Sequence, residues 1–394
     1  MKMIGNIPVW GVADKGSVEQ MEMCARSAAH VALMADHHKG YSVPIGGVVA
    51  YEDEISPSGV GYDIACGNKA VLLDASAKDV KKNISRIMDD IQAQISFGVG
   101  RSNKDSVEVD MFDDDPAWDI KYIKSLKELA RQQFGTVGSG NHYVDIFVDE
   151  QDRVWCGVHF GSRGLGHKIA SHFIKASDGK DGMMVEPCRL DTKSDLGQQY
   201  ITSMNLAGRY AYAARDWVCQ KVAGIIGAHI LDEVHNHHNF AWQENHNGRD
   251  LWVVRKGATP CFKGQRSFIG GSMGDISVII RGKDSDDSAA SLRSAPHGAG
   301  RVMSRTEASG KRRWKKGKLL KLSDGCVSKE MMTDWIRSFN NVELRGGGTD
   351  ESPHVYKRLK DVLKYHSKGL QVMNTLMPIG VCMAEDKSFD PYKD

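Results

Sequence analysis

The 394-residue sequence predicts an α+β fold, with β-sheets flanked by helices in one large mixed domain over residues 1–394. Short apolar segments of strand length, such as RVWCGVHF (153–160) and DISVIIRG (275–282), are interspersed with longer amphipathic segments. The two kinds do not alternate regularly, which argues against a doubly wound parallel sheet. Hydrophobic residues make up 41% of the chain, enough to bury a substantial core.

Helices are expected, in chain order, at 80–95, 122–134, 200–226 and 354–376, where apolar residues recur with helical spacing. Between them, 103–119 (NKDSVEVDMFDDDPAWD) is predicted to be an acidic loop and 310–321 (GKRRWKKGKLLK) a basic, exposed run. Trp314 within the basic run raises the alternative that it stacks on nucleic-acid bases.

Charge and composition indicate a protein of the cytoplasm that does not enter membranes. The formal net charge of +2 neither demands nor excludes a nucleic-acid partner. No apolar run approaches the length of a membrane span, and the first residues do not resemble a signal peptide. The eight cysteines lack the tight spacing of a disulfide scaffold and suit a reducing compartment.

Several segments carry residue types that bind metals. Asp63 and Cys66 stand three apart between glycines, although such an isolated pair is more often structural. His142 and His159 each lie where an extended segment meets a glycine-bearing turn, and such junctions often form sites. Close by, Arg163 offers a fork for phosphate, and the amides of GSGN (138–141) could form an anion nest.

The segment DEVHNHHNF contains three histidines, His235, His237 and His238, which are either solvated at the surface or partly engaged in metal binding. If the segment is extended, His235 and His237 share one face and His238 points the other way. Together with the residues above, this makes five mixed O, S and N ligands, more than one tetrahedral ion needs. A bridging thiolate would allow two ions, and the ligand types alone favour zinc, then manganese or cobalt.

The loop SAPHGAGRVMSR places His297 beside two glycines and two arginines. Glycine allows backbone to approach a bulky group closely, and arginine forks match phosphate oxygens. The loop is therefore either a phosphate-facing reactive site or a glycine-rich turn in which His297 only caps a neighbouring segment.

These motifs together resemble those of one known family. In order, the chain contains MADHHKGYSVPIGGV, GVGYDIACG, GTVGSGNH, HFGSRGLGH, HHNF, RKGAT, GGSMG and HGAGRVMSR. They resemble the signature segments of the RtcB family of RNA ligases, from about Asp36 to Arg305 and again around DESPHVYK. The resemblance implies a GTP- and manganese-dependent ligase that joins RNA 3′-phosphate or 2′,3′-cyclic phosphate ends to 5′-hydroxyl ends in RNA repair or tRNA splicing. It also allows an archease-type activating protein as a partner.

The resemblance also implies residue roles. By it, His297 is the nucleophile that forms a histidine–GMP intermediate. One of two Mn²⁺ ions would be held by Asp63, Cys66 and His142, and the other by Cys66, His159 and His238. Arg163 and Arg301 would contact the phosphates of the RNA or the nucleotide. The nucleotide-binding set implied in this way comprises Asn141, Gly271, Ser272, Met273, Gly298, Ala299, Gly300 and Tyr356.

Two departures from the family pattern concern the guanine base. Asp145 stands where the family commonly has Glu, and Ala384 where it has a lysine that contacts guanine; Lys387 is the nearest lysine that could substitute. The altered C-terminus favours a divergent branch that repairs RNA.

Two other functions compete with the ligase. A dinuclear metal-dependent RNA phosphoesterase would need the metal ligands but not His297. A non-catalytic RNA-binding module would rely on the basic run and have no use for five metal-type residues.

Overall fold

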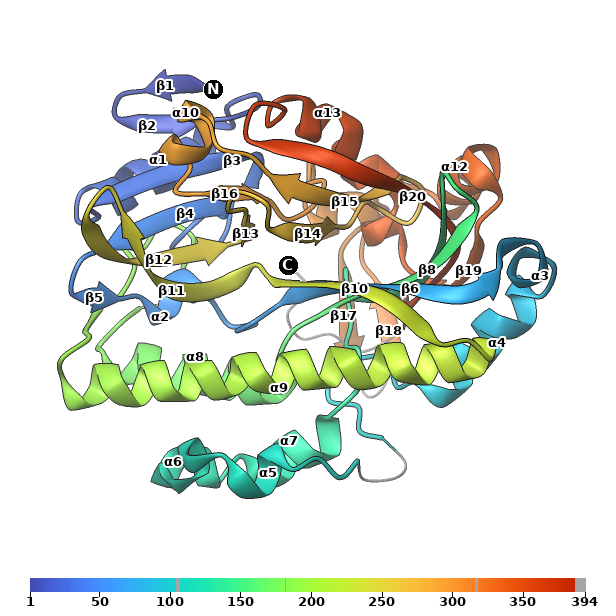
Figure 1. The fold of residues 1–394 in the computed structure, drawn as a ribbon, viewed down its shortest axis with the longest axis horizontal. Helices are drawn as coiled ribbons and strands as arrows, with labels where there is room; N and C mark the ends of the chain where they lie inside the picture. The colour runs from blue at the N-terminus through green and yellow to red at the C-terminus, as the bar shows by residue number, and fades with distance from the viewer. Residues whose placement is uncertain (104–106, 181, 316–317, 387–394) are drawn as a thin grey trace.

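The computed structural model describes residues 1–394 except 104–106, 181, 316–317 and 387–394. Two antiparallel-rich sheets lie above a long helix in the view of Figure 1. The smaller, six-stranded sheet has the order β1-β2-β3-β4-β12-β11. Its strands are β1 (Lys2–Ile4), β2 (Ile7–Val9), β3 (His30–His38), β4 (Ile45–Tyr51), β11 (Asn239–His246) and β12 (Arg249–Lys256).

The larger, eight-stranded sheet has the order β10-β6-β8-β7-β20-β15-β14, with β19 added in parallel to β20. Its strands are β6 (Gly67–Ser76), β7 (Tyr143–Asp149), β8 (Arg153–Phe160), β10 (Ile230–His237), β14 (Arg266–Ile269), β15 (Ser277–Gly282), β19 (Glu343–Gly347) and β20 (Leu370–Glu385). Three small pairs complete the strands: β5 (Glu54–Ile55) with β9 (Leu190–Asp191), β13 (Ala258–Pro260) with β16 (Ser294–Pro296), and β17 (Arg312–Lys315) with β18 (Lys318–Lys321). The mixed α+β prediction is confirmed.

The helix expected at 200–226 is confirmed and is longer than predicted. Helix α9 (Asp195–Ile226) begins after Ser194, whose side chain accepts a hydrogen bond from the Gly197 amide, and it ends at Gly227 in the left-handed conformation. It runs beneath the larger sheet beside α8 (Arg163–Ala176) (Figure 1). No helix among the described residues, α9 included, is both long and apolar enough to cross a bilayer.

The other helix predictions need correction. Region 80–95 is divided at Asn83 into α3 (Ala77–Lys82) and α4 (Ile84–Gln94), and 122–134 into α6 (Lys121–Lys124) and α7 (Lys127–Gln133). Only α13 (Leu359–Lys364) forms within 354–376, because residues from Leu370 onward join β20, which pairs with β7 and β15 on its two sides.

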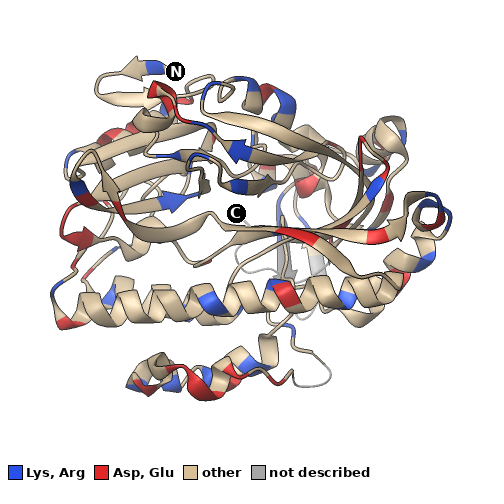
Figure 2. Cartoon of the chain, in the orientation of Figure 1, with Lys and Arg blue, Asp and Glu red and all other residues tan. Residues whose placement is uncertain are grey.

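The two charged segments contain regular structure, which corrects the expectation of a loop for the acidic one. The described part of the acidic region 103–119 contains α5 (Met111–Asp114) and a 3₁₀ turn (Pro116–Asp119), so it is not simply a loop. The basic run 310–321 contains the hairpin β17–β18, and the side chain of Trp314 lies outside the described residues. Figure 2 shows Lys and Arg interspersed with Asp and Glu over the fold, with many acidic residues in the short helices below α9.

Four further helices connect these parts: α1 (Lys15–Ala25), α2 (Pro57–Val60), α10 (Asp286–Ala290), and α11 (Arg305–Ser309), while α12 (Lys329–Asn340) covers one end of β20. The main core lies between α9, α8 and the larger sheet. Strand β10 leads into β11 with only His238 between them, so the chain passes from one sheet to the other at that residue. The candidate site lies at this crossing.

Candidate active site

A cavity of about 1360 Å³ opens where the two sheets meet. Fifteen of the sixteen residues predicted from the sequence line it. These are Asp63, Cys66, Asn141, His142, His159, His238, Gly271, Ser272, Met273, His297, Gly298, Ala299, Gly300, Arg301 and Tyr356. The sixteenth, Arg163, lies behind the wall, with Nη1 3.4 Å from Nδ1 of His142.

Two groups of metal-type side chains share one sulfur atom. Cys66, His159 and His238 form one group and Asp63, Cys66 and His142 the other, with the ligand atoms of each group within 4.8 Å of one another. The Cys66 Sγ atom lies 3.2 Å from Nε2 of His159 and 3.6 Å from Nε2 of His142. The fold therefore groups the five candidate ligands around one shared sulfur in the expected way.

Adjacent strands bring these ligands together. Asp63 and Cys66 lie in the turn before β6, His142 directly precedes β7, and His159 is near the end of β8, which pairs with both strands. The His238 amide donates to the Cys66 carbonyl (2.8 Å). The alternation expected for the histidine cluster is confirmed, because His238 lines the cavity while His235 and His237 bond Arg215 on the opposite face. None of the three is exposed, so the surface alternative is wrong.

The protonation chemistry of these groups suits a cation. Burial lowers the pKa of both His159 and His238, which keeps the imidazoles neutral and able to donate a lone pair. Burial opposes ionisation of Asp63, but a hydrogen bond and the charge of His142 lower its pKa to about 2. Burial and the Asp63 carboxylate raise the pKa of the Cys66 thiol, so a thiolate there needs a cation beside it. The Nδ1 atom of His238 is buried without a hydrogen-bond partner among the described residues, as a metal-facing nitrogen would be.

Arg215 of α9 is completely buried behind this centre and was not singled out from the sequence. Its guanidinium donates to the carbonyls of Ala65 (3.0 Å) and Phe160, which are the chain neighbours of Cys66 and His159.

The same side chain also reaches the histidine segment of β10. The Arg215 Nε atom donates to Nε2 of His235 (2.7 Å), and Nη2 lies 2.9 Å from Nδ1 of His237. One side chain thus ties together the three segments that present Cys66, His159 and His238. The two histidines that the sequence left unassigned serve this structural role.

His297 faces the cavity and is held by a buried carboxylate. Its Nδ1 lies 2.7 Å from Oδ2 of Asp36 at the end of β3, and the amides of His297 and Gly298 donate to the same oxygen (3.0 and 3.2 Å). Burial opposes ionisation of Asp36, yet the hydrogen bond and charge of His297 lower its pKa. A carboxylate can only accept, so Nδ1 carries a proton, and in the neutral imidazole the free lone pair is on Nε2.

The position of His297 decides between the two interpretations of its loop. Its ring centroid lies 4.7 Å from that of His238, next to the metal-type group, so the imidazole does not merely cap a neighbouring segment. Gly300, with φ of 76°, packs against β3, since a Cβ there would lie 2.1 Å from the Asp36 carbonyl oxygen. This glycine therefore seats the loop on the strand that carries Asp36.

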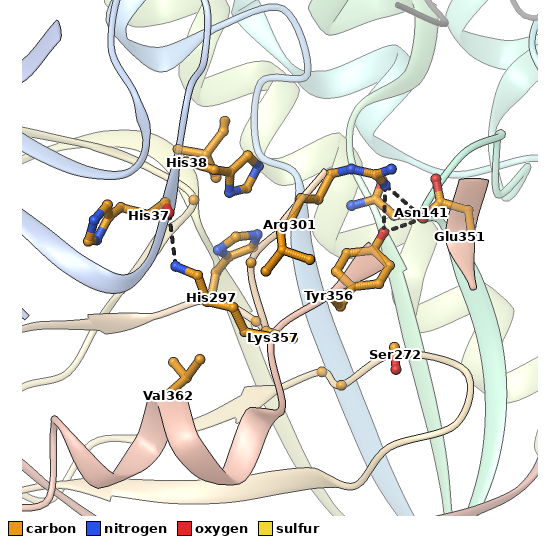
Figure 3. Close-up of a pocket in the computed structure, with 18 of the residues that line it drawn as sticks. His37, His38, Asn141, Ser272, His297, Arg301, Glu351, Tyr356, Lys357 and Val362 are labelled. Atoms are coloured by element: carbon orange, nitrogen blue, oxygen red, sulfur yellow. Dashed lines mark hydrogen bonds and ion pairs between the residues drawn. The ribbon is translucent and has the colours of Figure 1, made fainter. Parts of the chain in front are cut away.

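On one side of His297, polar and cationic groups form a linked network (Figure 3). Arg301 donates to the Tyr356 hydroxyl (3.1 Å) and to the Asp350 carbonyl (2.8 Å), and its guanidinium lies over the Tyr356 ring. Glu351 bonds the same hydroxyl and pairs with Arg305. Arg301 is thereby fixed in orientation at the cavity wall.

The wall beyond this network holds the loop Gly271–Met273, between β14 and β15, and Asn141 before β7. Asp145 also lines the cavity; its Oδ1 has no hydrogen-bond partner among the described residues, and burial raises its pKa well above the usual value. Ala384 is buried in β20 and is not among the lining residues, whereas Val381 and Met383 are. Lys387 lies outside the described residues.

Comparison with known proteins agrees with this geometry. The family model described as "tRNA-splicing ligase RtcB" matches residues 17–384. The RNA-splicing ligase RtcB of Escherichia coli K12 is 30% identical over 90% of each chain. The tRNA-splicing ligase RtcB of Archaeoglobus fulgidus is 30% identical over 94% of this chain and 91% of its own. The chain belongs to the RtcB family.

Proposed function

We propose that this protein is a GTP- and manganese-dependent RNA ligase. It joins RNA 3′-phosphate or 2′,3′-cyclic phosphate ends to 5′-hydroxyl ends, in RNA repair or tRNA splicing. The observation that carries the proposal is the placement of His297, which is bonded to Asp36 and adjacent to a ligand set that shares one thiolate. Free thiols at all eight cysteines suit a cytoplasmic location.

The ligand set fits two cations. Asp63, Cys66 and His142 would hold one Mn²⁺ ion, and Cys66, His159 and His238 the other. Bound there, the ions would supply Lewis-acid polarisation of phosphate oxygens. The mixture of sulfur, nitrogen and oxygen ligands also suits zinc, so the metal dependence is part of the proposal.

In the first step, Nε2 of His297 attacks the α-phosphorus of GTP. A nitrogen–phosphorus bond forms, and the bond from that phosphorus to the pyrophosphate oxygen breaks. Nδ1 donates a hydrogen bond to Asp36 throughout, and the carboxylate stabilises the positive charge that develops on the ring.

In the later steps the RNA ends enter. Water first opens a cyclic end to a 3′-phosphate. An oxygen of this phosphate attacks the phosphorus of histidine–GMP and breaks its bond to His297, which activates the RNA end. The 5′-hydroxyl oxygen then attacks the RNA phosphorus and displaces GMP to form the phosphodiester, and the hydroxyl proton passes to water. Arg301, held in place by Tyr356 and Asp350, offsets the charge on these phosphates.

On the nucleotide side, Asn141, Gly271, Ser272 and Met273 would contact GTP, and Tyr356 would pack near the base. Asp145 lines the same wall, and its buried carboxyl group would accept a hydrogen bond from a donor group of the base. Position 384 holds alanine and does not line the cavity. Recognition of guanine in this chain would therefore use other residues.

The experiment that tests the proposal is labelling with α-³²P GTP, and separately ATP, in the presence of Mn²⁺. Wild type is compared with His297→Ala. We expect acid-labile label only with GTP and only when His297 is present. Labelling by ATP would retain the mechanism and change the base specificity. No label from either nucleotide, with metal bound, would overturn the ligase and favour the metal-dependent phosphoesterase. Adding an archease-type protein tests whether labelling needs an activator.

A further inference from the structure

The cavity is larger than one nucleotide requires. Pockets that hold one drug-sized ligand measure about 300–1000 Å³, whereas this cavity measures about 1360 Å³. His297 lies within it rather than at one end. In Figure 3, His37, Val362 and the amine of Lys357 lie on one side of His297, and Tyr356, Glu351 and Ser272 lie on the other. The proposed nucleotide occupies the second side, which leaves the first without a ligand.

The lining also includes Lys39, Tyr41, Lys256, Lys357 and Tyr365, here named the lysine–tyrosine arm, of which Figure 3 shows Lys357 on the first side. Lys39 and Tyr41 belong to the loop after β3, Lys256 ends β12, and Lys357 and Tyr365 flank α13, which packs against β3. Lys256 donates to the Tyr41 carbonyl, and Lys357 donates to the carbonyls of Ala35 (2.9 Å) and His37 (3.0 Å). These bonds fix both amines in position, and the carbonyls that hold Lys357 carry no net charge.

The charge of the arm is positive. Three lysines line it, and burial lowers the pKa of both His37 and His38, so neither adds charge at neutral pH. Two carboxylates also line the cavity beside these lysines: Asp361 pairs with Lys364 (2.7 Å), whereas Asp14 accepts from the amide and hydroxyl of Ser17 and keeps its negative charge, which leaves three lysines against one uncompensated carboxylate. An anion therefore fits this side better than a neutral or cationic ligand.

Two aromatic rings stand at the rim of the arm. Tyr365 is 45% exposed and Tyr41 41% exposed, so part of each side chain is open to solvent. Exposed aromatic rings interleaved with lysines are the pattern that binds single-stranded nucleic acid, in which bases stack and phosphates meet cations. A polyanion carrying unstacked bases is the occupant that satisfies both features.

We propose that the lysine–tyrosine arm binds the terminal single-stranded nucleotides of an RNA substrate, with bases stacked on Tyr365 and Tyr41 and the backbone near Lys39. This inference rests on the proposed function, because the RNA end must reach the phosphorus that His297 carries. Beyond that function, the inference specifies the surface along which one RNA strand extends from His297 to the outside of the cavity.

The test uses Tyr365→Ala and Lys39→Ala in the full chain. Both positions are exposed, so neither change removes a buried contact. Phe262→Ala and Lys368→Ala serve as matched controls, since both are exposed and neither lines the cavity. Fluorescence anisotropy measures binding of two single-stranded oligoribonucleotides, one ending in a 3′-phosphate and one in a 5′-hydroxyl, each labelled at the opposite end.

We expect Tyr365→Ala to weaken binding of one of the two oligonucleotides by about tenfold, the scale of one lost stacking contact. Lys39→Ala should lower the slope of log affinity against log salt by about 0.7, the value for one phosphate contact on a single strand. The oligonucleotide that is affected identifies the strand. GMP labelling of His297 should be unchanged in both variants.

Three results would overturn the inference: affinities within twofold of wild type, equal losses in the controls, or no binding of either oligonucleotide by wild type. If wild type forms the GMP adduct and ligates RNA while the variants bind RNA normally, only the inference fails. If wild type neither labels nor ligates, the proposed function fails, whatever the binding shows.

Discussion

The Nδ1 atom of His297 lies 2.7 Å from Oδ2 of Asp36, and the same oxygen accepts the amides of His297 and Gly298. Asp36 has no solvent exposure, so the carboxylate has few alternatives to this imidazole. One buried oxygen thus sets both the tautomer of the ring and the path of the loop that carries it.

Asp36→Asn should slow the formation of histidine–GMP by a factor on the order of 10²–10⁴, because an amide in place of the carboxylate permits the wrong imidazole tautomer. The rate of label incorporation from GTP measures this. Asp149→Asn is the matched control, since Asp149 is also buried and its pKa is also lowered, through its bonds to Arg153 and Trp155, but it does not line the cavity. An equal loss in the control would mean that the effect is a general loss of stability.

Removal of the shared sulfur should affect both ions, and removal of one imidazole only one. We expect Cys66→Ser to bind close to no Mn²⁺ and His142→Ala to bind about one ion per chain, as measured by elemental analysis after gel filtration. With Co²⁺, the sulfur-to-metal charge-transfer band should vanish in Cys66→Ser and persist in Cys261→Ser, a buried thiol outside both groups. A Cys66→Ser protein that keeps two ions would show that the thiolate does not bridge.

Arg215→Lys should weaken metal binding by about 10–100-fold, the range for residues that support ligands. Lysine keeps the charge but cannot reach two carbonyls and two imidazoles with one fork. Calorimetric titration with Mn²⁺ measures the loss, and Arg209→Lys, exposed on the same helix, should bind normally. If Arg215→Lys binds metal as wild type does, Arg215 only supports packing.

Asp145→Asn should raise the unfolding free energy of the nucleotide-free protein at neutral pH. Burial raises the pKa of Asp145, so the folded state holds its proton more tightly than the unfolded state. Stability is then lost as pH rises above the unfolded value of 3.8, by at most about 1.4 kcal/mol per pH unit for one proton. Urea unfolding of both proteins between pH 4 and pH 8 measures the difference.

The decisive observation is how this difference in unfolding free energy changes with pH. The gap between Asp145→Asn and wild type should widen as pH rises, and a constant gap would mean that Asp145 does not change its protonation on folding. A higher KM for GTP in the variant, with an unchanged KM in the exposed control Asp79→Asn, would add that the carboxyl meets the nucleotide.

Local patterns predicted much of the fold but not all. Helix α9 was found because its apolar period persists over many turns and needs no partner to be recognised. Residues 370–376 were assigned to a helix because an apolar run of that kind suits either structure. Pairing of residues 370–376 with β15, continued by the pairing of β20 with β7 from Leu376 onward, makes this segment a strand, and hydrogen bonds to distant strands leave no local signal.

The sequence by itself determined the chemistry that the candidate ligands and the loop of His297 offer, because sulfur, carboxylate and imidazole chemistry is a property of each residue. Only the tertiary structure decided that Asp36, 261 residues away, bonds His297 and that Arg215 ties together the segments that present three of the ligands. An aspartate after a strand and an arginine in a helix are common, and burial alone makes these two distinctive. Strand pairing brings such residues together, and the loss of water around them makes each hydrogen bond hard to replace.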